Sequence, residues 1–221
     1  MRTFFPAAAL LLASCGPAWA EEAFERTAIY LEQNIQDEDA EIKFDVVGGN
    51  AGLATLQVVA PDGRTVVTFR APDSKLGLRH FTLESPEPKN DGRLQVDFPA
   101  GTYKFLASTV GGAKLEGQAV LSHKFPLPTA FVHPLPDQKN VPISGMQVRW
   151  SAVKDLAGYI VVLEQEKTGR EIRANLSAGA TGFAVPGGFL LPGTTYKLAI
   201  GTVSKEGNRS FVETEFMTVK K

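Results

Sequence analysis

Cysteine is almost absent from this 221-residue chain, and the one cysteine, Cys15, lies close to the N-terminus. The rest of the chain therefore has neither a disulfide nor a free thiol, so its stability has to come from apolar cores. Histidine is also scarce: His80, His123 and His133 are far apart in the sequence, and none lies near a serine in a sharp turn sequence. Zinc sites need closely spaced ligands, and hydrolases need a nucleophile beside a base. We therefore predict a protein that is not an enzyme and that needs no cofactor.

An excess of positive charge is missing as well. The formal net charge is -1 and the sequence pI is about 6.3. A protein that binds nucleic acid neutralises phosphates with a basic face, so nucleic acid is not an expected partner. Long apolar runs are also lacking, since no segment is long and apolar enough to cross a bilayer as a helix.

The N-terminal residues form a targeting segment. Arg2 precedes a short apolar run, Phe4 to Ala13, and Ala18-Trp19-Ala20 supplies the small residues that a signal peptidase reads. This predicts a signal peptide over residues 1–20 and an exported protein that is periplasmic or secreted. Leu12-Ala13-Ser14-Cys15 also resembles the lipobox of bacterial lipoproteins, which would lipidate Cys15 and anchor the protein to the envelope. Both routes stay open, with cleavage after Ala20 preferred, and a membrane is a partner only in the second.

Glycine and proline are plentiful, and they separate short apolar runs. The 21 Gly and 14 Pro, together with alternating segments such as Glu41 to Val47, are typical of an all-β chain with many turns. The alternation of Leu94, Val96 and Phe98 predicts one more strand. Residues 22–35 fit either a helix or a first strand. The spacing of strands and turns predicts two consecutive β-sandwich domains of the immunoglobulin or fibronectin III-like kind.

The domain boundary is expected in a proline-rich stretch. Four prolines lie between Phe125 and Pro136, and each fixes its own φ and drives the preceding residue toward an extended conformation. We therefore expect a first domain over residues 21–125, a stiff linker over 126–136 and a second domain over 137–221. The two domains should form a semi-rigid rod.

The second half resembles fibronectin type III domains. The residues that carry this resemblance are Trp150, Tyr159, the run Leu190-x-Pro192-x-Thr194-x-Tyr196 and the Gly207-Asn208 turn. It covers about Leu127 to Val219. The resemblance implies that Trp150 fills the core between the sheets and that Tyr196 makes a corner hydrogen bond to upstream backbone. The first half resembles an uncharacterised β-domain that precedes such a domain in some secreted bacterial proteins, and this implies no activity.

Candidate ligand sites are sparse. Asn34, Asp37 and Asp39 offer alternating oxygen atoms in one turn, as a calcium loop does, but the full pattern is missing, so no metal is predicted. Sugar binding needs exposed aromatic rings, and only Tyr30 is left uncommitted by the expected cores. We therefore predict a non-catalytic extracytoplasmic binding, adhesion or scaffold protein. It would act on a protein partner through sheet edges and loops. The alternative is an accessory carbohydrate-binding module of an envelope enzyme system.

Overall fold

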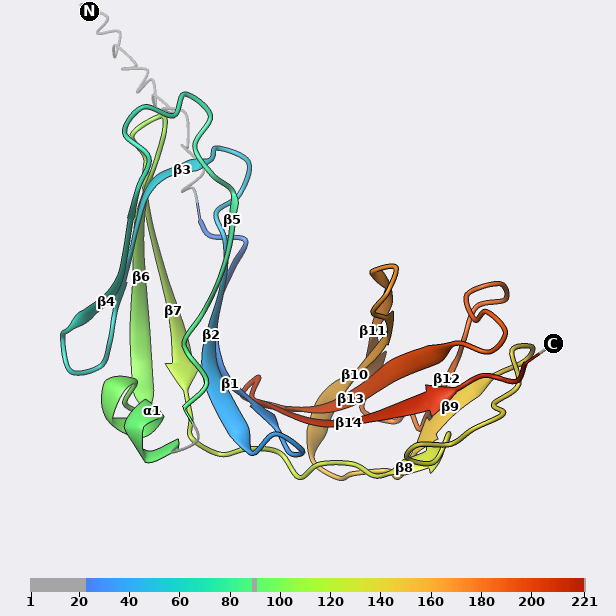
Figure 1. Ribbon diagram of the computed structural model, residues 1–221. Helices are drawn as coiled ribbons and strands as arrows, with labels where there is room; N and C mark the ends of the chain where they lie inside the picture. The colour runs from blue at the N-terminus through green and yellow to red at the C-terminus, as the bar shows by residue number, and fades with distance from the viewer. Residues whose placement is uncertain (1–22, 89–90, 221) are drawn as a thin grey trace, which may run out of the picture.

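The computed structural model describes residues 23–88 and 91–220, which form β-strands and one short helix (Figure 1). The elements of the first half are β1 (Arg26–Asn34), β2 (Asp39–Val47), β3 (Leu53–Val59), β4 (Thr65–Arg70), β5 (His80–Glu84), α1 (Asp91–Asp97), β6 (Gly101–Thr109) and β7 (Lys114–Leu121). Those of the second half are β8 (Phe131–His133), β9 (Gln147–Trp150), β10 (Leu156–Gln165), β11 (Arg170–Ser177), β12 (Gly182–Ala184), β13 (Thr195–Ser204) and β14 (Arg209–Met217).

Each half is a sandwich of three strands on four. In the first half, neighbouring β1, β2 and β5 face the sheet β4-β3-β6-β7. In the second half, β12-β9-β8 faces β11-β10-β13-β14. In both halves the first, second and fifth strands form the smaller layer, so the two sandwiches share one topology. This confirms the predicted all-β class, and it makes the first half a second copy of the fibronectin III-like fold.

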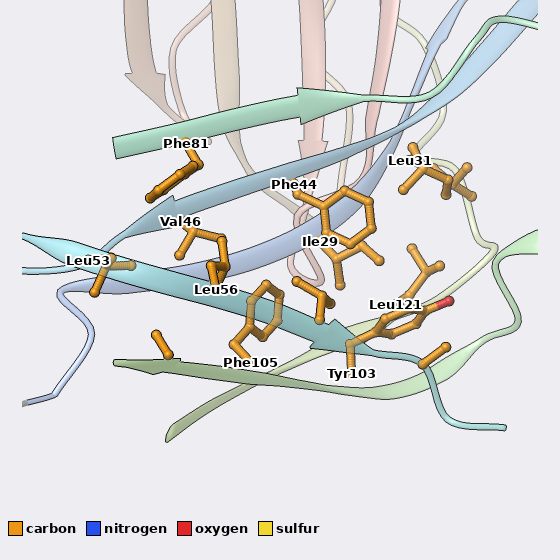
Figure 2. Packing of buried hydrophobic residues seen from close by; sticks show 14 of the residues in the cluster. Ile29, Leu31, Phe44, Val46, Leu53, Leu56, Phe81, Tyr103, Phe105 and Leu121 are labelled. Carbon is orange, nitrogen blue, oxygen red and sulfur yellow. The ribbon is translucent and has the colours of Figure 1, made fainter. Parts of the chain in front are cut away.

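The first core is rich in aromatic rings (Figure 2). Phe44 meets Phe98 and Tyr103 edge-on, with ring centroids 6.1 and 6.5 Å apart. Tyr103 is fully buried, and its hydroxyl donates a 3.0 Å hydrogen bond to the carbonyl of Pro99. Burial raises the pKa of Tyr103 to about 12. A buried tyrosine needs such a partner, because an unpaired hydroxyl in a core costs free energy.

Of the four residues named from the sequence, Trp150, Tyr159 and Tyr196 lie in the second core, and Pro192 lies in the turn before β13. Trp150 is 2% exposed, and its ring centroid lies 5.5 Å from that of Tyr159. The hydroxyl of Tyr196 accepts from the backbone N–H of Leu191 at 2.9 Å and donates to a carbonyl upstream, as a tyrosine corner does. Pro192 accepts a hydrogen bond from the Thr194 hydroxyl in the turn before β13.

The structure corrects one predicted strand and decides one segment that the sequence left open. The prediction of a strand at Leu94, Val96 and Phe98 is wrong, because this stretch forms α1, and the Phe98 N–H donates to the Leu94 carbonyl at 2.8 Å. Leu94 is 4% exposed and Val96 is 74% exposed. Leu94 and Phe98 therefore share one helix face at i,i+4 spacing, which three alternating residues could not distinguish from a strand. Residues 22–35, left open between helix and strand, contain β1.

The two sandwiches are joined by a shared sheet. β1 pairs in parallel with β14, so one seven-stranded sheet runs β11-β10-β13-β14-β1-β2-β5 through both halves. The seam matches Glu32 with Arg209 and Asn34 with Phe211. β8 lies inside the segment expected to be a linker and pairs with β9. Figure 1 shows the sandwiches as the arms of an open V instead of a straight rod, with the seam near the vertex.

Candidate functional site on the inner face of the shared sheet

One face of the shared sheet belongs to neither core. Successive side chains of a strand point to opposite faces. On β2, Ile42 and Phe44 enter the first core, which leaves Glu41 and Lys43 on the other face. On β14, Val212 and Phe216 enter the second core in the same way. The remaining face, between the arms of the V in Figure 1, is called the inner face below.

A cluster of paired charges occupies the inner face beside the seam. The Lys43 ammonium lies 2.9 Å from a carboxylate oxygen of Glu32, 2.9 Å from one of Glu41 and 3.4 Å from one of Glu84. Glu32 also accepts from the guanidinium of Arg209 at 3.0 Å, so this ion pair crosses the seam. Side chains alternate between the two faces of a strand, and these charged groups all lie on the non-core face of neighbouring strands, which brings them together.

The protein surroundings shift the pKa values in this charge cluster. Burial raises the pKa of Glu41, because its charged form is poorly solvated. Burial alone would lower the pKa of Lys43, but hydrogen bonds to Glu41 and Glu32 outweigh it, and the pKa of Lys43 is raised. Lys43 is therefore a firmly charged centre that two carboxylates hold in place.

Tyr30, the aromatic residue left uncommitted by the sequence, is covered. The guanidinium of Arg209 lies 4.0 Å from its ring centroid, and Tyr30 is 7% exposed. Burial also raises the pKa of Tyr30. Such a cation–π contact contributes about 0.5–2 kcal/mol. The ring is therefore part of the seam and offers no open platform for a sugar.

A groove of ≈ 320 Å³ runs along the inner face across the seam. Its apolar part comes from Val162 on β10, Ala199 on β13 and Phe211 on β14. The Phe211 ring lies directly over Gly201, where a Cβ atom would come within 2.6 Å of the ring. The charged part of the lining consists of six carboxylates and two cations, namely Glu32, Asp37, Asp39, Glu41, Glu87, Glu213, Arg173 and Lys197.

The weak metal candidates lie at the rim of this groove. Asn34 and Asp37 contact each other, because the Asn34 amide nitrogen donates to the Asp37 carboxylate at 2.7 Å. The Asn34 carbonyl oxygen accepts from the Gln36 N–H, and Asp39 begins β2. Within residues 23–88 and 91–220, no group of three or more His, Cys, Asp or Glu side chains is placed to hold a metal ion.

The histidines lie on separate elements. His80 on β5 lies 2.9 Å from a carboxylate oxygen of Asp45, which also pairs with Arg26. His123 follows β7, and its ring lies 2.9 Å from the carbonyl oxygen of Phe98. His133 is on β8. His80 alternates with core residues of β5 and so lies on the inner face, but none of the three histidines lines the groove.

Some expected features are outside the described residues. The signal peptide and Cys15 lie there, so the structure does not describe the two processing routes. In the part of the chain that is described, no helix is long and apolar enough to cross a membrane.

The main residue that sequence reasoning missed is Asn208. It is 0% exposed and lies in the turn before β14. Its side-chain oxygen accepts from the Leu31 N–H at 2.9 Å, and its amide nitrogen donates to the carbonyls of Ser122 and Lys124 at 2.8 and 2.9 Å. One side chain of the second sandwich thus binds three backbone groups of the first sandwich. In the sequence, Asn208 stands out only as part of the Gly207-Asn208 turn and of the polar run Asn208-Arg209-Ser210 at the start of a strand.

Comparisons with known proteins show a general likeness only. No family model and no curated protein matches the chain. Among solved structures, fibronectin(III)-like modules of Clostridium thermocellum CbhA are 8% identical over 89% of this chain and 93% of theirs, with a TM-score of 0.37. A two-domain fibronectin type III segment of chicken tenascin is 14% identical over 88% and 96%, with a TM-score of 0.33. The BSP domain of a biofilm-associated protein is 14% identical over 90% and 30%, with a TM-score of 0.31. At these scores, no function follows from the likeness.

Proposed function

We propose that this protein is a non-catalytic extracytoplasmic binding or scaffold protein that holds a protein partner on its inner face. The observation that carries the proposal is the continuous sheet, which fixes groove residues from both sandwiches in one register. A face built in this way needs no hinge movement before a partner binds. Pre-organised surfaces bind with a smaller entropy cost than surfaces that become ordered on binding.

The hydrogen bonds at the seam support this pre-organisation. Besides the Asn208 contacts, the Ser210 hydroxyl donates to the carbonyl of Pro126 at 2.7 Å, and Gln33 donates to the Ser210 hydroxyl at 2.6 Å. Each such bond contributes about 0.5–1.5 kcal/mol of net stability. Interfaces between domains are mobile by default. Here several such hydrogen bonds surround the three paired residues of β1 and β14, and together they hold the angle between the two arms of the V.

The free sheet edges fit a partner less well than the inner face does. The shared sheet ends at β11 on one side and at β5 on the other. β11 begins with Arg170 and Glu171 and carries Arg173, and β5 is five residues long. Short strands and charged side chains are the features by which sheet proteins discourage strand addition. We therefore assign partner binding to the face and its groove.

The test compares two charge reversals in a capture experiment. Arg173→Glu changes an exposed side chain that lines the groove, and Arg149→Glu makes the same change on β9, in the sheet that does not reach the seam. The mature protein is used to capture partners from the native envelope, and the partners are identified by mass. We expect Arg173→Glu to change the amount of a specific captured partner relative to the wild type, and Arg149→Glu to leave that amount unchanged. Equal capture by both variants would show that the inner face is not the binding surface.

A further inference from the structure

We infer that the groove on the inner face binds a cationic side chain, arginine or lysine, presented by the partner polypeptide. This inference rests on the proposed function, because it names the chemistry of the partner. It starts from the two unlike parts of the groove. Val162, Ala199 and Phe211 are apolar, whereas the ends of β1 and β2 and the loop after β5 bring carboxylates.

An arginine or lysine side chain has the same two parts. Its methylene stem packs on apolar surface while its charged head stays with polar partners. The stem would lie along Val162 and the exposed edges of Ala199 and Phe211, which are each 7% exposed, and the head would meet carboxylates at the rim. A guanidinium or ammonium group makes its strongest hydrogen bonds to carboxylate oxygens. A purely apolar side chain would leave the rim carboxylates without any new contact.

The charges of the groove are unevenly satisfied. Glu32 and Glu41 are paired with Lys43, and Glu213 is 2.7 Å from the Lys197 ammonium. Three carboxylates make no ion pair, namely Asp37, Asp39 and Glu87, although Asp37 accepts from the Asn34 amide and has an electrostatic interaction with Lys197. Among the described residues, no ion pair or side-chain hydrogen bond engages Asp39 or Glu87.

The excess of carboxylates without an ion pair determines the charge of the group that the groove can bind. Arg173 is the one lining cation without an ion pair in the described part of the chain, whereas three lining carboxylates lack an ion pair. An anionic group would therefore be repelled, and a cation would be attracted. Because the three carboxylates without an ion pair come from the first sandwich and the apolar floor from the second, the site exists only while β1 and β14 are paired.

The experiment is a titration of the isotopically labelled mature protein followed by amide chemical shifts. The probe is the capped peptide Leu-Ala-Arg-Ala-Leu, and its counterpart carries citrulline, which is neutral and has nearly the same shape. The test variant is Asp39→Asn with Glu87→Gln. The control is Asp73→Asn with Glu116→Gln, which removes the same charge from exposed positions that do not line the groove.

We expect the arginine peptide to shift the amides of groove residues such as Ala199 and Asp39. Its affinity should fall about tenfold in the test variant and less than twofold in the control, since tenfold corresponds to one good charged contact. The citrulline peptide should lose affinity by a similar factor. Equal binding of the two peptides, or an unchanged affinity in the test variant, would overturn the inference.

Separate outcomes distinguish the inference from the proposed function. If Arg173→Glu changes partner capture but the groove ignores the arginine peptide, the inner face binds a partner of other chemistry and the inference fails alone. If the peptide binds as expected while capture is indifferent to Arg173→Glu, the assigned function fails. Spermidine is titrated in parallel. Stronger binding of spermidine than of the peptide would make this a site for small cations and refute a polypeptide occupant.

Discussion

Asn208 gives the sharpest test of the seam. The substitution Asn208→Ala removes one hydrogen bond to the Leu31 N–H and two to the carbonyls of Ser122 and Lys124. Three net hydrogen bonds amount to about 1.5–4.5 kcal/mol, and a buried donor left unpaired costs about 1–3 kcal/mol more unless water replaces the partner. Carbonyls near the surface recover a water molecule easily, so we expect a loss of about 3 kcal/mol in the free energy of unfolding.

The assay is urea unfolding of the mature protein, followed by tryptophan fluorescence and by circular dichroism. Trp150 is the only tryptophan outside the segment that contains Trp19, so fluorescence follows the second sandwich. We expect the two signals to coincide in the wild type and to separate in Asn208→Ala, because the sandwiches lose their coupling. Asn175→Ala, on an exposed position of β11, is the control and should cost less than about 0.5 kcal/mol. If the two substitutions cost the same, Asn208 does not hold the seam.

The remaining predictions concern the second core, the charge cluster, processing and metal. Trp150→Ala should cost about 3–5 kcal/mol because it leaves a large cavity, whereas Tyr196→Phe should cost about 1 kcal/mol; urea melts that reverse this order would contradict the core assignment. The folded-state pKa of Lys43 is raised above its ordinary value of 10.5, so the stability that Lys43 contributes is complete below that pH and is lost as the pH rises through the folded pKa. Wild-type stability should therefore fall more steeply in strong alkali than that of Lys43→Gln, and parallel curves would refute this linkage. The exported protein should begin at Glu21 without lipid, and an intact mass that matches a diacylated chain from Cys15 would disprove cleavage after residue 20. Calcium should not shift the thermal melt relative to a chelator, and a clear upward shift would revive a metal site in the turn between β1 and β2.

The sequence predicts the sandwiches well because their signals are local. Alternating apolar residues identify most strands, and Trp150 with Tyr196 identifies the second core from a short window. The sequence also contains a second indication of the fold of the first half. Pro99-Ala100-Gly101-Thr102-Tyr103 parallels the turn that leads into β13 and Tyr196 near its start, and both tyrosines donate hydrogen bonds to upstream carbonyls. The shared topology of the two halves was therefore present in the sequence as a repeated tyrosine corner.

The seam and the groove were beyond sequence reasoning because their contacts are far apart in the chain. Glu32 and Arg209 are separated by 177 positions, and nothing in either segment indicates a parallel pairing. The prolines between the sandwiches predicted an extended path, and they do not determine the angle between the arms. That angle depends on which strand of the second half β1 joins. Pairing specificity between distant strands comes from side-chain partners, which a pattern within one segment does not contain.

The chemistry of the seam explains how a few residues can fix that pairing. Each sandwich buries apolar side chains, which pack against many alternative neighbours at similar cost. The seam instead uses groups that need particular partners: the amide of Asn208, the guanidinium of Arg209 and the hydroxyl of Ser210. A slip of one residue would turn the Arg209 side chain to the opposite face from Glu32 and would leave buried polar atoms unpaired. Because an unpaired buried group costs more than a paired one contributes, the polar seam selects a single register and with it the shape of the groove.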